Sequence, residues 1–310
     1  MVFGIAEFTC LLRPPLPLLT FLAIIKPSVS NSFNSAEILK QTVKIFLLYS
    51  ILTILIFFIL SLGAETKVFV LGSGTPNPDP DRGGSSYLIM VDKTPYLIDF
   101  GAGVVRNFAG LTKEWGGDLE VDTTSIEHAF LTHMHSDHTL GLSDLIITPW
   151  IMGKTKSLKL HGPKELDLMA KNIINAYAFD INYRINGTQP QNSTGYKYDF
   201  FEIYDGYIYK NEEIRLEAFK NSHGELEKSF GFVVTTDDLK IVFSGDTAPS
   251  SKLIEKSKGA DILVHEVFSE AGFLKKTPDW QIYHAAHHTS PEQLGSIANK
   301  IKPKKLVLSH

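Results

Sequence analysis

Three histidines and an aspartate lie within six consecutive positions of this chain, at His133, His135, Asp137 and His138, directly after the apolar run 126–131. If that run is a strand ending in a turn, His133 and His135 face the same side, because alternate residues of a strand do so. The turn then directs the next two donors toward a neighbouring point. An ordinary loop or core does not need this density of nitrogen and oxygen donors. The spacing therefore indicates a site for two adjacent metal ions.

This string resembles the His-x-His-x-Asp-His motif of the metallo-β-lactamase superfamily. The other residues that the resemblance implies are present in the expected order. They are a ligand histidine after a strand, a bridging carboxylate and a last histidine after a short apolar strand, at His223, Asp246 and His310. The earlier Asp99 resembles the carboxylate that braces the histidine cluster in this superfamily. The resemblance covers residues 67–310.

The resemblance implies two metal sites bridged by Asp246 and a solvent oxygen. The two ligand sets are His133, His135 and His223 for one site, and Asp137, His138 and His310 for the other. Imidazole and carboxylate donors without thiolate favour zinc, two ions per chain, although manganese or iron fits the same ligands. Because even one zinc ion lowers the pKa of bound water to about 7, the bridging water becomes a hydroxide nucleophile. Hydrolysis is the chemistry that we expect.

Further stretches narrow the resemblance to one branch of the superfamily. Residues 68–76 and 82–86, and the late His-Glu and His-Thr-Ser-Pro-Glu motifs, are similar to the ribonuclease Z group of zinc phosphodiesterases and its arylsulfatase-like relatives. In that group a glutamate and a distal histidine donate a proton to the leaving oxygen. The matching residues are Glu266 and His288, which together with Asp137 are the expected catalytic residues.

Other histidines and aromatic residues compete for these roles. His284 and His287 are close alternatives to His288, which is preferred only because it aligns with the group's motif. Aromatic side chains more often pack than bind substrate, and this is the interpretation that we prefer for Trp150, Trp280 and Tyr283. Three histidines are expected to bind no metal: His128 on the surface, His161 bonded to backbone at a strand end, and His265 in the core.

Strands and helices must position these residues. Along the sequence a run of predicted strands comes first, helices follow, and a second run of strands completes the chain. Strands are predicted at residues 67–71, 86–91, 95–99, 126–131, 158–161, 213–221, 231–235, 240–244, 262–265 and 305–308. Helices are predicted at residues 141–148, 163–179, 249–256 and 291–300, with proline at or near their first turns. The resemblance implies an α/β fold, the αββα metallo-β-lactamase sandwich of two mixed β-sheets flanked by helices. Periodicity alone fits other α/β sandwiches equally well.

The sequence divides into three predicted parts. Residues 1–44 form a leader whose translation start is in doubt. If translation began at Leu39, residues 39–44 would form the short basic segment that ordinarily precedes the apolar part of a signal peptide. Residues 45–64 carry no charge, and about twenty such residues can cross a bilayer, so a signal peptide or a membrane anchor is predicted there. Residues 65–310 form the hydrolase domain. This division predicts a protein that is exported, to the periplasm or the exterior, or anchored in a membrane.

Charge and cysteine content limit the partners. The single cysteine, Cys10, lies in the leader, so no disulfide is expected. The whole chain has a net charge of −4, and because residues 1–64 are net positive the remainder is more acidic still. An acidic body binds polyanions poorly. Residues 178–210 also hold few cations, where tRNA-trimming members of the group carry a basic arm, so tRNA is disfavoured as a substrate.

We therefore predict a dinuclear zinc hydrolase, a ribonuclease Z-like phosphodiesterase that acts on a small or medium-sized ester. The alternatives are a hydrolase of another ester class, such as an aryl sulfate, a lactone or a β-lactam, and a metal-binding protein without turnover. The resemblance also implies a homodimer. The sequence stops at His310, where family members continue. Either the sequence is truncated or, if His310 is the true end, we expect weaker occupancy of the second metal site.

Overall fold

The computed structural model of the chain describes residues 35–60 and 65–310. The first part of the predicted leader, with Cys10, and the small residues 61–64 before Glu65 lie outside the described residues. The predicted start at Leu39 and the division at residues 44 and 64 stay predictions.

Residues 35–60 form one helix, α1, Ser35–Leu60. Among the helices of the described residues, none combines the length and the apolar character needed to cross a membrane. The anchor or signal predicted at residues 45–64 therefore gains no support from the structure.

Residues 65–310 contain two six-stranded mixed sheets. The strands of the first sheet, in spatial order, are β1 Thr66–Gly72, β2 Ser86–Val91, β3 Thr94–Ile98, β4 His128–Phe130, β5 Leu158–Gly162 and β6 Tyr198–Glu202. The strands of the second sheet are β12 Lys305–Ser309, β11 Ile262–Glu266, β10 Lys240–Phe243, β9 Phe230–Thr235, β8 Arg215–Lys220 and β7 Ile208–Lys210. In each sheet an antiparallel part, β1 to β3 or β7 to β10, continues into parallel pairs.

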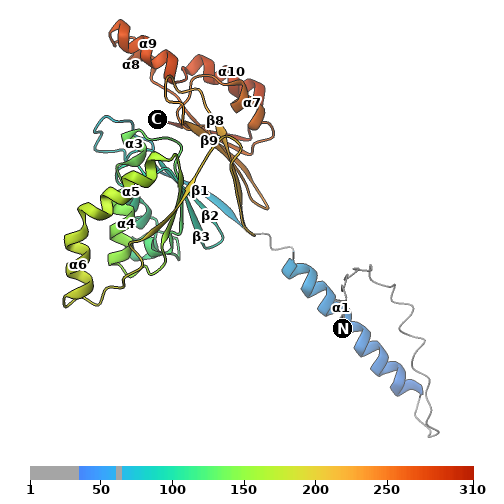
Figure 1. The fold of residues 1–310 in the computed structure, drawn as a ribbon. Coiled ribbons are helices and arrows are strands. Elements are labelled where there is room, and N and C mark those ends of the chain that lie inside the picture. Colours follow the sequence, from blue (N-terminus) through green and yellow to red (C-terminus); the bar gives the residue numbers. More distant parts are fainter. Residues whose placement is uncertain (1–34, 61–64) are drawn as a thin grey trace, which may run out of the picture. The chain divides into compact units, whose positions relative to one another are not determined.

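Helices cover the outer faces of both sheets, as Figure 1 shows for α4 to α6 on one side and α7 and α10 on the other. The helices are α2 Val104–Ala109, α3 Ser136–Thr139, α4 Leu142–Ile151, α5 Glu165–Ala176, α6 Ala178–Asn186, α7 Ser251–Lys256, α8 Glu270–Phe273, α9 Pro278–His287 and α10 Pro291–Ile301, with short 3₁₀ turns η2 Lys113–Trp115 and η3 Thr123–Ser125. Three apolar clusters hold these layers together, one under α2, α4, α5 and α6, one between the sheets, and one under α7 and α10. Burial of these clusters is the main force that keeps the sheets and helices in place.

The predicted αββα sandwich is confirmed. Each of the ten predicted strands corresponds to a strand of the structure, while β6 and β7 were not predicted. Both unpredicted strands are edge strands with exposed or half-buried residues, so their sequences lack the apolar run of a central strand. The helix predicted at 163–179 is two helices, α5 and α6, that meet at Tyr177.

Two histidines have positions that differ from the predictions. His128 is buried rather than at the surface, and His161 contacts side chains rather than backbone. The His128 Nδ1 and His161 Nε2 atoms are 3.3 Å apart, and the remaining ring nitrogens meet the hydroxyls of Tyr209 at 3.2 Å and Tyr207 at 2.9 Å. This polar cluster joins β4 and β5 of the first sheet to β7 of the second. Burial lowers the pKa of His128 to about 4 and that of His161 to about 3.

The cluster predicts a loss of stability in acid. Because the folded-state pKa values lie below the ordinary 6.5, the unfolded chain binds protons first as the pH falls below that value. Each histidine should then lower the free energy of unfolding by about 2 kcal/mol between pH 7 and pH 5. Urea unfolding of metal-free protein at both pH values should show a smaller loss for His161→Gln than for the unaltered chain. Equal losses in the two proteins would contradict this role of His161.

Candidate metal centre

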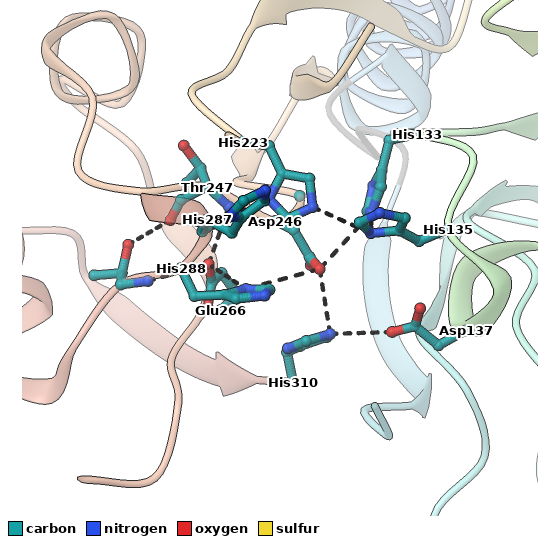
Figure 2. Close-up of polar contacts among 12 residues, drawn as sticks. His133, His135, Asp137, His223, Asp246, Thr247, Glu266, His287, His288 and His310 are labelled. Atoms are coloured by element: carbon teal, nitrogen blue, oxygen red, sulfur yellow. Dashed lines mark hydrogen bonds and ion pairs between the residues drawn. The ribbon is translucent and has the colours of Figure 1, made fainter. Parts of the chain in front are cut away.

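The predicted metal ligands gather at one edge of the sandwich, where several strands end. His133 and His135 follow β4, Asp137 and His138 lie on α3, and His223, Asp246 and His310 follow β8, β10 and β12. Figure 2 shows His133, His135 and Asp137 facing His223, Asp246 and His310 across a small gap. The fold therefore brings together residues that are up to 177 positions apart, from His133 to His310.

The first cluster consists of His133, His135, His223 and Asp246, whose donor atoms all lie within 4.8 Å of one another. The Nδ1 atom of His135 lies 3.1 Å from Nε2 of His133 and 3.1 Å from Nε2 of His223. Two nitrogen ligands of a tetrahedral zinc ion, each 2.0–2.1 Å from the metal, are separated by about 3.3 Å. His135 thus has, toward each of the other two imidazoles, the spacing that a shared ion requires.

The second cluster consists of Asp137, His138, Asp246 and His310, again with donor atoms within 4.8 Å. His310 Nε2 lies 3.0 Å from an oxygen of Asp137 and 3.2 Å from one of Asp246. Asp246 is the residue that belongs to both clusters, and its side chain is almost fully buried. Its position is that of a carboxylate able to bridge two ions.

Unsatisfied atoms and protonation states fit a pair of cations at this place. Within residues 35–60 and 65–310, His138 Nε2 is buried without a hydrogen-bond partner, and carboxylate oxygens of Asp246 and Asp137 lie 3.3 and 3.5 Å from it. Burial lowers the pKa of His223 to about 4 and that of His133 well below its ordinary value, so that these rings are neutral and have a free lone pair. Burial opposes ionisation of Asp246, but the neighbouring His310 and His138 keep its pKa well below the usual range. Burial opposes protonation of His138 and His310, but Asp246 raises the pKa of both rings above the ordinary value, so zinc binding would displace protons from them.

Asp99 braces the second cluster, as the resemblance implies. One of its oxygens accepts hydrogen bonds from His138 Nδ1 at 2.8 Å and from the Thr132 hydroxyl at 3.0 Å, and the other accepts from the Thr132 N–H at 2.8 Å. The Thr132 hydroxyl also lies 3.0 Å from His133 Nδ1, so a single carboxylate orients one ligand of each cluster. Asp99 has a positive φ of 58°, an uncommon conformation that places its carboxyl behind the histidines. The role of Thr132 was missed, although it directly precedes the histidine motif.

Glu266 and His288 form the predicted pair beside the second cluster. Glu266 Oε1 accepts hydrogen bonds from the backbone of Thr247 and Thr289, and it lies 3.2 Å from His288 Nδ1. Burial, reinforced by Asp246, raises the pKa of Glu266 well above its ordinary value, and burial lowers the pKa of His288 to about 4. Burial thus disfavours the charged form of both groups.

The structure distinguishes His288 from its alternatives. His287 holds its ring 3.3 Å from Glu225, and its backbone carbonyl accepts a hydrogen bond of 2.8 Å from His223 Nδ1. The ring nitrogens of His284 are buried without a hydrogen-bond partner among the described residues. Of the three histidines, His288 is the one that contacts Glu266.

A cavity of about 870 Å³ opens onto the centre. His135, Asp137, Asp246, His288 and His310 lie in its wall. Trp280 and Tyr283 also line it, whereas Trp150 is fully buried, in keeping with the packing role preferred from sequence. Because this size is typical of small-molecule sites, the centre can be reached by a compact ligand.

Two mixed sheets with histidine and aspartate clusters at one shared edge define the metallo-β-lactamase class of hydrolases, and solved structures agree. The short form of human tRNase Z aligns with a TM-score of 0.59 and 21% identity, over 79% of this chain and 92% of that one. The metallo-β-lactamase fold protein YhfI of Bacillus subtilis aligns with a TM-score of 0.58 and 18% identity, over 79% and 86% of the two chains. At these identities the likeness concerns the fold.

The chain belongs to the family described as Anti-Pycsar protein Apyc1, whose sequence model matches residues 66–310. It is 30% identical to the ribonuclease Z of Mycolicibacterium paratuberculosis, over 79% of this chain and 85% of that protein. The ribonuclease Z of Mycolicibacterium gilvum is 29% identical, over 79% and 83%. The predicted ribonuclease Z-like, metal-dependent hydrolase class is confirmed.

The contacts of Asp99 predict its effect on metal retention. Asp99→Asn removes the charge that orients His138 and should weaken zinc binding by about 10-fold to 100-fold. Competition against a chromophoric chelator measures this change. Asp118→Asn, at an exposed position, is the matched control and should bind zinc as the unaltered chain does. Equal affinity in the two variants would show that Asp99 does not support the site.

Proposed function

We propose that this protein is a dinuclear zinc-dependent phosphodiesterase that acts on a small or medium-sized diester. The observation that carries the proposal is the position of Asp246, whose carboxylate belongs to both donor clusters at the end of the cavity. A pair of clusters with a shared carboxylate suits two ions that act together on one ester. Manganese and iron fit the same donors, and zinc is preferred because imidazole nitrogens predominate.

The proposed ligands form two sets, one for each ion. His133, His135 and His223 would hold one ion, and Asp137, His138 and His310 the other, with Asp246 between them. The chemistry that such an ion pair supplies when bound is acidification of a water molecule, which then attacks phosphorus. Asp99 and Thr132 keep the rings in orientation for this arrangement.

Glu266 and His288 are placed to assist departure of the leaving group. The bond that breaks joins phosphorus to the leaving oxygen, which needs a proton unless it is a stable anion. His288 lines the cavity and contacts Glu266, so the pair is placed to donate a proton to that oxygen. Glu266 keeps its position through the backbone N–H groups of Thr247 and Thr289.

The size and charge of the chain favour a compact substrate. Residues 178–210, where tRNA-trimming enzymes of the group carry a basic arm, contain α6, β6 and β7, and both strands belong to the sheets. Arg82 and Lys276 are cations in the cavity wall, enough for one phosphate group rather than a polyanion. Cleavage of a tRNA precursor is the second candidate, favoured by the name of the ribonuclease Z relatives. The homodimer implied by the resemblance stays an expectation.

The bridging position of Asp246 gives the primary test. Zinc-loaded protein should hydrolyse bis(4-nitrophenyl) phosphate, and Asp246→Ala should abolish nitrophenol release because both ion sites lose a donor. Absorbance of released nitrophenolate measures turnover, with Asp118→Ala as the exposed control. No turnover in the unaltered chain would favour a binding protein, and full turnover in the Asp246 variant would exclude this centre as its source.

The role of His288 is tested by varying the leaving group. Phenolate is a strong base, with a conjugate-acid pKa of about 10, whereas nitrophenolate is a stable anion. His288→Ala should therefore lower kcat/KM for diphenyl phosphate by about 100-fold or more, and that for bis(4-nitrophenyl) phosphate much less. Equal effects on the two diesters would contradict proton donation. Unchanged activity on both would instead favour a lactone or β-lactam hydrolase, which needs no such acid.

A further inference from the structure

One wall of the cavity is built from aromatic side chains that the metal centre does not use. These residues lie on or between β11, α8 and α9 and are Phe268, Phe273, Trp280 and Tyr283. The rings of Phe268 and Phe273 stack at 4.9 Å, and those of Trp280 and Tyr283 meet edge to face at 5.4 Å. Aromatic walls with few polar groups are typical of sites for small organic ligands.

Trp280 is the unusual member of this wall. Its side chain is 55% exposed, whereas Trp150, which packs in the core, is fully buried. A tryptophan in the core contributes by burial, whereas the exposed Trp280 ring in the cavity wall can be reached by a ligand. Lys276 lies 5.8 Å from the centre of the Trp280 ring and adds a cation to the same wall.

The wall is continuous with the catalytic pair. Trp280 contacts Tyr283, and the Tyr283 ring lies 6.2 Å from that of His288. His284 lies one helical turn before His288, between the rings of Trp280 and His288. Its buried ring nitrogens lack a hydrogen-bond partner among the described residues. Buried polar atoms without partners are rare and call for a functional explanation. A substituent attached to a phosphate at the metal centre would lie along this wall.

We propose that Trp280 is a specificity-determining residue that stacks on a flat ring carried by the phosphodiester. The inference rests on the proposed function, because it assumes that the phosphate group occupies the metal centre. The cavity of about 870 Å³ has room for a phosphate together with one ring system. Lys276 neutralises negative charge on the same substrate.

Binding of two phosphate monoesters tests the proposal without turnover. 4-Nitrophenyl phosphate and ethyl phosphate carry the same charged group and differ in the ring. Calorimetry on the zinc-loaded full chain should give a preference for the aromatic ester in the unaltered protein and in Trp280→Phe. Trp280→Ala should bind 4-nitrophenyl phosphate about tenfold more weakly and ethyl phosphate equally well. Trp115→Ala, which removes an exposed tryptophan outside the cavity wall, is the matched control and should keep the preference.

Two results would overturn the proposal. One is an unchanged preference in Trp280→Ala, and the other is an equal loss of affinity for both esters, which would indicate a structural effect. Hydrolysis of bis(4-nitrophenyl) phosphate separates this proposal from the proposed function. If Trp280 only positions the ring, Trp280→Ala should raise KM and leave kcat unchanged. If the unaltered chain hydrolyses the diester and Trp280→Ala has no effect, only the stacking role of Trp280 is rejected. If binding depends on the ring but no hydrolysis occurs, only the proposed phosphodiesterase function is rejected.

Discussion

The carboxylate of Asp246 is the group on which the rest of the site depends. It is buried among four imidazoles, those of His133, His138, His288 and His310, within 4.0 Å of a ring nitrogen of each. A buried anion is costly unless cations or hydrogen-bond donors compensate it, and imidazoles directed at the same point are suited to share metal ions with it. Removing this one charge would take away the donor that the two clusters share.

The sandwich supplies the place for this carboxylate. Strands β4, β8, β10 and β12 belong to two different sheets, and their ends meet at one edge, so ligands distant in sequence come close together. The apolar layer between the sheets fixes their distance, and Asp99 with Thr132 fixes the rotation of the rings. Packing thus determines where the donors are, and a few buried hydrogen bonds determine where they point.

The residue types and spacing of the motif predicted that the donors at positions 133–138 lie close together, whereas His223, Asp246 and His310 were implied by the resemblance to the superfamily. Strand positions were also predictable wherever a strand is apolar on a buried face. The exposed edges β6 and β7 were not, since their residues carry no such pattern. The burial of His128 and the place of Trp280 depend on contacts between distant segments, His128 with Tyr209 and Trp280 with the cavity, and no local spacing encodes them.

We propose that two ions share the Asp246 carboxylate. X-ray absorption spectroscopy of the zinc-loaded full chain measures it most directly, because the scattering reports both ligand type and metal-to-metal distance. We expect two zinc ions per chain, bound by nitrogen and oxygen, about 3.5 to 4 Å apart. A single isolated ion, or two ions with no metal neighbour within that range, would contradict it.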